Sequence, residues 1–276
     1  MTDPALFKTN TSYTPAEELI INYIIESPQE FLLQSIHEVA RGLGISEATV
    51  SRFARHAGFA DFKALKASVA ARSLGPADKM SASIGEGAGD ARAFLRQQRE
   101  TLDRTREGLD VDAFEAAARA LAEARRVFIH GKGAAASVAE LLRFRLRRYG
   151  LAVELLPAGG SELMEGLVHA QAGDVLVAFG FQRIPAEAQA LLDRGAKTGC
   201  TTLLFSDRMV RSDGAVADIE LYTYRGEARA YHSMASAVAL VDALVVAVGA
   251  HMDGAALELL GQLKDLKRAY ERLLPR

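Results

Sequence analysis

The sequence has only one cysteine and a polar, acidic start, and each of these two features excludes a class of protein. A single cysteine, Cys200, rules out an internal disulfide framework or a multi-cysteine metal site. Its apolar surroundings favour a small buried residue over a nucleophile. The start of the chain does not have the pattern of a signal peptide. The most apolar segment, Met234–Ala250, contains Asp242 and has no flanking basic anchor, so we expect a core helix of a cytoplasmic protein without a membrane span.

Composition and charge indicate a globular chain with one basic region. Apolar residues make up 49% and charged residues 25% of the 276 positions, enough for one large domain or two smaller ones. The net charge of −2 excludes a uniformly basic nucleic-acid coat. Residues 1–34 contain one lysine against five acids, whereas residues 35–75 contain six lysines or arginines against three acids. A nucleic-acid contact is therefore expected in the second segment.

The segment Ser35–Phe59 predicts a short helix, a glycine-containing turn and a second helix. Gly42 and Gly44 interrupt the first helix. Ser46 then lies at a helix N-cap position, where its side chain can accept a hydrogen bond from a backbone amide of the next turn. This is the helix-turn-helix arrangement, in which the second helix enters the major groove of DNA.

The second helix has one apolar and one polar face when its residues are placed about 100° apart. The side chains expected to pack inward are Val50, Phe53, Ala54 and Ala57. Arg52 and Arg55 point the other way, and arginine can pair with guanine edges or phosphates. The alternative is an ordinary helical hairpin with a charged exposed face. The turn glycines, the N-cap and the small outward residues together favour DNA binding.

We therefore predict an interface with double-stranded operator DNA. Its members are Ser35, Ser46, Glu47, Ala48, Thr49, Ser51, Arg52, Arg55 and Lys63. A small apolar side chain such as Ala48 could touch a thymine methyl group.

The chain divides into three segments by pattern. Residues 1–75 predict an all-α helix-turn-helix domain, and residues 76–90, rich in glycine, serine and alanine, predict a linker. In residues 91–276, β-branched runs alternate with helices, which predicts an α/β domain with a doubly wound parallel sheet. Ligands on such sheets bind at the carboxyl ends of the strands. The loops at 131–136 and 180–185 are therefore candidate ligand loops.

This organisation resembles the RpiR-type bacterial transcriptional regulators over nearly the whole chain. The segments that carry the resemblance are Thr14–Glu17, Ile45–Phe59 and Phe62–Lys66 in the first domain, and Val127–Ala135, Gly173–Phe179 and Tyr231–Met234 in the second. The second group is similar to a SIS domain, the sugar-isomerase fold that such regulators use to sense small molecules such as carbohydrate derivatives. The resemblance implies a DNA-binding regulator with a small-molecule effector.

Two positions depart from the SIS pattern. Ala135 stands where a serine is usual in the first loop, and Gly180–Pro185 replaces a serine-rich phosphate loop. Lys132 and Arg183 add positive charge beside helix N-termini, which still favours an anionic effector, either a sugar phosphate or a carboxylate. A pocket that has lost its ligand stays open as an alternative. The candidate effector-binding residues are Lys132, Gly133, Ala134, Ala135, Gly180, Phe181, Gln182, Arg183 and Ser233.

No other site type is indicated by the sequence. Gly131–Gly133 lacks the third glycine of a dinucleotide fingerprint, and no histidine has a partner at metal-ligand spacing. His130 and His232 are the two histidines placed to line a pocket. We expect no cofactor, no metal, no catalytic residues and no enzymatic activity. We also expect the protein to be a homodimer or a homotetramer. The rival hypothesis is a sugar-phosphate isomerase with an appended helical domain.

Overall fold

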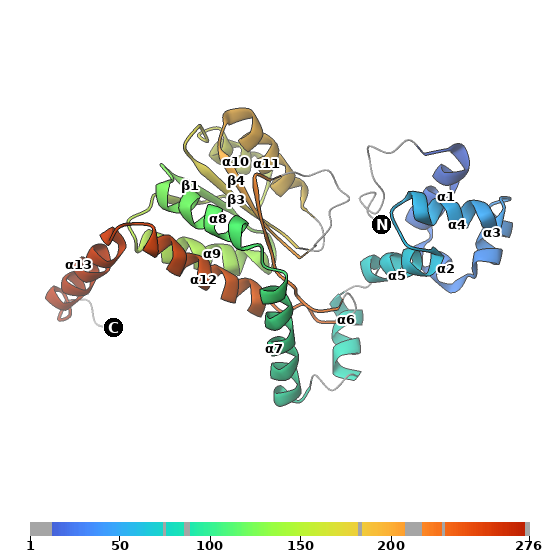
Figure 1. Ribbon diagram of the computed structural model, residues 1–276, viewed down its shortest axis with the longest axis horizontal. Coiled ribbons are helices and arrows are strands. Elements are labelled where there is room, and N and C mark those ends of the chain that lie inside the picture. Colours follow the sequence, from blue (N-terminus) through green and yellow to red (C-terminus); the bar gives the residue numbers. More distant parts are fainter. Residues whose placement is uncertain are drawn as a thin grey trace. The chain divides into compact units, whose positions relative to one another are not determined.

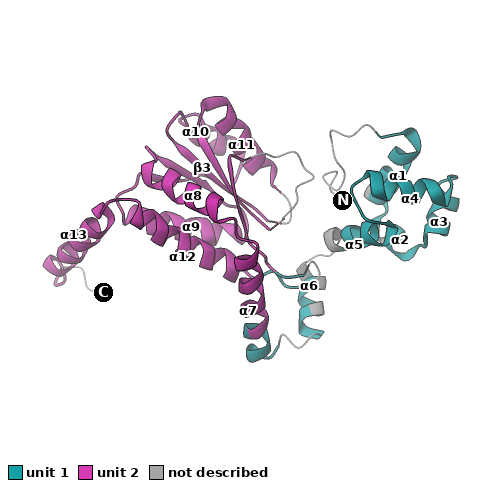
Figure 2. Ribbon diagram, viewed as in Figure 1, with its two compact units in different colours: residues 1–95, 210–214, 226–232 teal, residues 96–209, 215–225, 233–276 magenta. Residues whose placement is uncertain are grey.

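The computed structural model describes residues 13–73, 76–85, 89–181, 184–207, 217–227 and 230–273. The chain forms two compact units (Figure 2). Unit 1 contains residues 1–95, 210–214 and 226–232, and unit 2 contains residues 96–209, 215–225 and 233–276. The predicted linker at 76–90 is not entirely loop, because Pro76–Ser83 forms helix α6. The domain boundaries proposed from composition stay a prediction.

Five helices at the start of unit 1 form the helix-turn-helix body (Figure 1). They are α1 (Pro15–Glu26), α2 (Pro28–Leu33), α3 (Ile36–Gly42), α4 (Glu47–His56) and α5 (Phe62–Ser73). Thr14 and Ser35 close capping boxes with the glutamates three residues later, which satisfies amides that a helix start leaves unpaired. The helices enclose one apolar core, in which Phe31, Phe53 and Leu65 are inaccessible to solvent.

The second part of the chain alternates helices and strands (Figure 1). Its elements are α7 (Ala91–Glu107), α8 (Val111–Glu123), β1 (Val127–His130), α9 (Ala135–Arg147), β2 (Val153–Leu155), α10 (Gly160–Leu167), β3 (Val175–Gly180), α11 (Ala186–Thr198), β4 (Thr201–Ser206), β5 (Ile219–Tyr222), α12 (Ala235–Ala250) and α13 (Ala255–Ala269). The strands form a five-stranded sheet of order β2-β1-β3-β4-β5, and every pairing is parallel. The predicted doubly wound α/β fold is confirmed.

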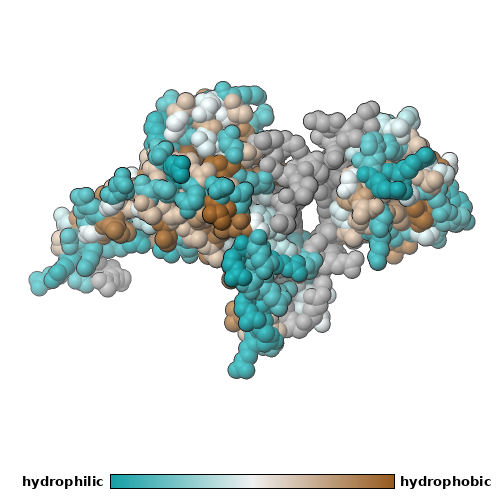
Figure 3. Space-filling view, viewed as in Figure 1, coloured by the Kyte–Doolittle hydropathy of each residue, from teal (hydrophilic) through white to brown (hydrophobic). Residues whose placement is uncertain are grey.

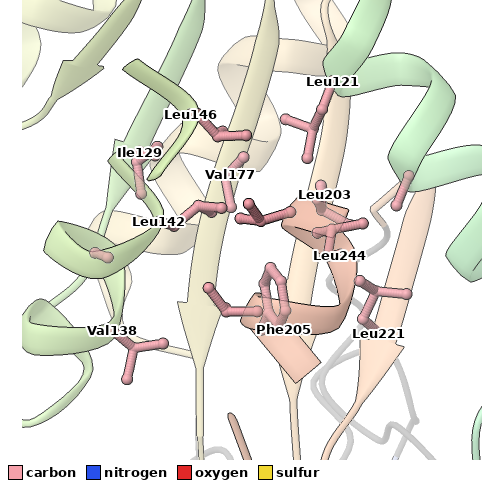
Figure 4. Close-up of a cluster of buried hydrophobic side chains, with 14 of the residues drawn as sticks. Leu121, Ile129, Val138, Leu142, Leu146, Val177, Leu203, Phe205, Leu221 and Leu244 are labelled. Carbon is pink, nitrogen blue, oxygen red and sulfur yellow. The ribbon is translucent and has the colours of Figure 1, made fainter. Parts of the chain in front are cut away.

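Each face of the sheet has its own apolar core. On one face α8, α9 and α12 pack on the strands through side chains such as Leu121, Leu142 and Leu244 (Figure 4). On the other face α10 and α11 pack on Phe128 and Leu176. Burial on both faces explains why β3 is an unbroken apolar run rather than an alternating one. The predicted buried position of Cys200 is confirmed, since it is 5% exposed.

No single helix among the described residues is long and apolar enough to span a membrane; α12 and α13 meet the length and composition test only as a pair bent by 103°.

Candidate functional site

Helix α4 is built as the recognition helix of the predicted motif. Its inward residues Val50, Phe53 and Ala54 have no exposed surface, as their spacing predicts. The Ser46 hydroxyl accepts a hydrogen bond from the Thr49 amide at 3.1 Å and so caps the helix start. Gly44 adopts a φ of +67° in the turn, a conformation that glycine reaches without steric cost.

The outward face of α4 carries the predicted DNA-contacting side chains. Ala48, Arg52 and Arg55 are exposed, while Thr49 and Ser51 are half-buried. The guanidinium groups reach back to hydroxyls one turn earlier: Arg52 Nη2 lies 3.5 Å from Thr49 Oγ1, and Arg55 Nη2 donates to Ser51 Oγ at 3.2 Å. These local bonds hold both arginines along one face. The orientation expected for them is confirmed, and contact with DNA stays a prediction.

Three further predicted residues lie around this helix. Ser35 is the N-cap of α3, and its hydroxyl donates to Glu38 Oε2 at 2.8 Å. Lys63 is exposed at the beginning of α5. Glu47, the first residue of α4, has Oε1 2.8 Å from His37 Nδ1.

One contact that fixes α4 escaped the sequence analysis. His56 Nδ1, in the last turn of α4, lies 2.8 Å from Glu17 Oε1 on α1. These residues are 39 positions apart, so no local pattern connects them. Glu17 also accepts from the Thr14 amide, and this one carboxylate therefore ties the recognition helix to the capped start of the domain.

The carboxyl ends of the strands form the second candidate site. His130, Gly180 and Ser206 end neighbouring strands at one edge of the sheet. After β1 the chain enters α9 on one face of the sheet, and after β3 it enters α11 on the other face. Such a point is where α/β proteins open a crevice for ligands. Gly131 has no room for a side chain, because a Cβ would lie 2.7 Å from the Ala135 carbonyl oxygen. The loop after β1 is therefore pressed against the start of α9.

Lys132 is exposed in this loop and has an ionic partner. Its Nζ donates to Glu187 Oε1 at 2.6 Å, from the loop to the first turn of α11. This hydrogen bond lowers the pKa of the Glu187 carboxyl below its ordinary value. The expectation that Lys132 adds net positive charge needs correction, since Glu187 balances it. An acid in the first turn of the helix after Pro185 is the signal that could have identified this partner.

Arg225 is the principal site residue that the sequence analysis missed. It follows β5 and is 8% exposed, with Nη1 3.5 Å from Asp207 Oδ2. Its guanidinium lies over the Phe181 ring at 4.5 Å from the centroid, and its Nε donates to the Ser233 carbonyl oxygen at 3.3 Å. Arg225 thus joins two predicted effector residues. An arginine three residues after the predicted strand Ile219–Tyr222 was the available signal.

The other predicted effector residues are placed as follows. Gly133 and Ala134 are exposed, Ala135 and Gly180 are buried, and Gln182 and Arg183 lie outside the described residues. The Ser233 hydroxyl accepts from the Ala235 amide at 3.1 Å at the start of α12. The predicted residues therefore form two groups, one around Lys132 and Glu187 near α11 and one around Phe181, Arg225 and Ser233 toward α12.

His130 lies beneath this edge with no exposed surface. Its Nε2 is 3.4 Å from the Ala158 carbonyl oxygen, and among the described residues Nδ1 has no hydrogen-bond partner. Burial lowers the pKa of the imidazole, because a low-dielectric environment disfavours its charged form. Burial therefore favours the neutral form of His130. The described residues contain no cluster of three His, Cys, Asp or Glu side chains that could hold a metal ion.

Comparison with known proteins relates the N-terminal helices to a family and the sheet domain to solved structures. Residues 4–73 match the helix-turn-helix domain of the rpiR family. The chain is 27% identical to the HTH-type transcriptional regulator HexR of Pseudomonas aeruginosa over 193 residues, which are 68% of this chain and 67% of that protein.

Two solved structures extend the match to the sheet domain. The sugar isomerase domain of an RpiR transcription factor from Sphaerobacter thermophilus superposes with a TM-score of 0.58 and 25% identity, over 63% of this chain and 97% of the other. The Vibrio vulnificus NanR protein, solved in complex with ManNAc-6P, superposes with a TM-score of 0.61 over 96% of both chains. Its identity is 18%, so this second likeness shows the fold alone.

Proposed function

We propose that this chain, an RpiR-type transcriptional regulator with an N-terminal helix-turn-helix domain and a C-terminal SIS-type domain, changes its affinity for operator DNA when a small anionic metabolite binds at the carboxyl edge of its sheet. The observation that carries the proposal is the exposed face of α4, where Arg52 and Arg55 stand beside small residues over a buried apolar face. A metabolite regulates binding if its affinity differs between two conformations that bind DNA differently. Such a regulator acts in the cytoplasm, where its operator is.

The experiment that tests this function is footprinting on the DNA flanking the chain's own gene, with and without candidate metabolites. We expect sequence-specific protection that changes in strength when a phosphosugar or a small carboxylic acid is added. Protection that no metabolite changes would favour a regulator with a ligand-dead SIS domain. The absence of protected sequence would contradict the proposal.

The effector is proposed to be a sugar phosphate or a carboxylate, bound without a cradle of serine hydroxyls. NanR, which shares the fold, was solved with a sugar phosphate. Here Ala135 and Gly180–Pro185 replace the usual hydroxyls, and Glu187 neutralises Lys132. An anion that leaves water needs compensating donors. Backbone amides and Arg183 are therefore the donors proposed for it, and no isomerase turnover is expected across a panel of phosphosugars.

Replacing Arg183 by alanine is expected to abolish the response to the effector while DNA binding without effector is unchanged. A planar guanidinium can hold a carboxylate or a phosphate through two parallel hydrogen bonds, and alanine removes them both. A thermal-shift screen of phosphosugars and small acids on both proteins measures this. Equal stabilisation of both proteins by the same ligand would remove Arg183 from the site.

We also propose that two copies associate through α9, α12 and α13. Phe144, Val246 and Leu257 are 52%, 71% and 74% exposed on these helices, and Figure 3 shows apolar surface along α12 and α13. A single recognition helix reads few base pairs, so paired half-sites are the usual solution. Contiguous exposed apolar surface can mark a protein–protein interaction site.

Sedimentation is expected to show a dimer or tetramer at micromolar concentration, and Val246→Arg is expected to shift it toward monomer because a charge would be buried at the contact. The matched control is Val168→Arg, since Val168 is 63% exposed at the end of α10. Dissociation by both substitutions, or by neither, would place the contact elsewhere.

A further inference from the structure

The first residue of the recognition helix is an acid, in the part of the domain that would approach DNA most closely. Glu47 is the only acidic residue of α4, whose other ionisable side chains are Arg52, Arg55 and His56. The N-terminal residues of a recognition helix contact base edges in the major groove. A carboxylate there is repelled by the phosphates, so it weakens binding unless a donor on the DNA compensates for it.

The Glu47 side chain is held in place by a neighbouring helix. His37 on α3 lies 2.8 Å from Glu47 Oε1, and the two side chains are 66% and 53% exposed. Because a carboxylate only accepts hydrogen bonds, the histidine nitrogen must be the donor. An ion pair this exposed adds little to stability. The ion pair instead orients the Glu47 carboxylate. Among the described residues Oε1 has a hydrogen-bond partner, whereas Oε2 can accept a hydrogen bond from another molecule.

The chemistry of the major groove limits what Oε2 can bind. Only the N4 amino group of cytosine and the N6 amino group of adenine donate hydrogen bonds there. The adenine amino group lies beside N7, an acceptor that would repel the second carboxylate oxygen, while cytosine has no acceptor on its own major-groove edge. A carboxylate therefore discriminates in favour of cytosine.

We propose that Glu47 is a specificity-determining residue that accepts a hydrogen bond from the N4 amino group of one cytosine in each operator half-site, and that His37 positions its carboxylate. This inference rests on the proposed DNA-binding function and adds the base that is read. The alternative explanation for an acid at this position is its favourable interaction with the helix dipole. That interaction does not depend on the DNA sequence.

The test is selection of binding sites from a random duplex library with the full chain, its Glu47→Ala variant and its Glu18→Ala variant. Glu18 is an exposed acid on α1, so its removal controls for the loss of one negative charge. We expect wild type and Glu18→Ala to require the same cytosine, and Glu47→Ala to accept any base at that position. His37→Ala is expected to relax selection at that position only.

A modified base then tests the contact itself. Replacing the selected cytosine by 2-pyrimidinone, which lacks the amino group, is expected to weaken wild-type binding about tenfold and to leave Glu47→Ala unaffected. The inference would be overturned by equal losses of affinity for both proteins, by unchanged base selection in Glu47→Ala, or by relaxed selection at an adenine. Selection of a sequence by wild type would still support the proposed DNA binding. If wild type selects no sequence, the proposed function itself fails.

Discussion

Replacing both Arg52 and Arg55 by alanine is expected to weaken operator binding by about 2–6 kcal/mol, from about 1–3 kcal/mol for each base-contacting arginine. Both side chains are exposed on the outward face of α4 and are held there by Thr49 and Ser51. They belong to the basic segment of a chain whose net charge is −2. A binding titration at fixed salt with each single variant and the double variant measures the effect.

The single variants separate the two kinds of contact. An arginine on a base edge relaxes specificity at one position, whereas an arginine on a phosphate weakens all sequences alike and lowers the salt dependence. Arg119→Ala, an exposed arginine on α8, is the matched control for the loss of one positive charge. Unchanged affinity in both Arg52→Ala and Arg55→Ala would contradict the placement of α4 on DNA.

Replacing Arg225 by alanine is expected to destabilise the sheet domain by about 3–5 kcal/mol, because it leaves the Asp207 carboxylate without its nearby guanidinium. The side chains of Arg225 and Asp207 are 7% and 10% exposed, so water cannot replace the lost partner well. The substitution also removes the stacking on Phe181. A loss of this size is a large part of the stability of a typical domain.

Hydrogen exchange of the β4 and β5 amides measures this loss in the sheet domain by itself, since the two units of the chain need not unfold together. The double variant Arg225→Met with Asp207→Asn is the control, and it is expected to recover part of the loss because neither buried charge remains. The exchange of amides in α1 and α4 should not change. A loss below about 1 kcal/mol would show that the pair is effectively exposed to solvent.

Local patterns in the sequence were sufficient for most of the helices and strands. The Ser46 cap, the turn at Gly44 and the spacing of Val50, Phe53 and Ala54 each act within one or two helical turns, and each appears in the structure as predicted. The parallel sheet followed from the alternation of apolar runs with helices, because parallel strands need long crossover connections. Two helices were missed: Pro28–Leu33, for which no helix was predicted, and Pro76–Ser83, whose small residues had indicated a linker.

The sequence by itself therefore determined the fold classes of both parts of the chain and the inward and outward faces of α4, and it predicts the edge of the sheet where a ligand would bind. Only the tertiary structure decided the charge partners: Lys132 with Glu187, Arg225 with Asp207 and Phe181, and His56 with Glu17. The physical reason is the separation along the sequence of the residues that interact. Helical periodicity and capping depend on neighbours within a few residues, whereas Lys132 and Glu187 are 55 positions apart and meet only because β1 and β3 lie side by side in the sheet.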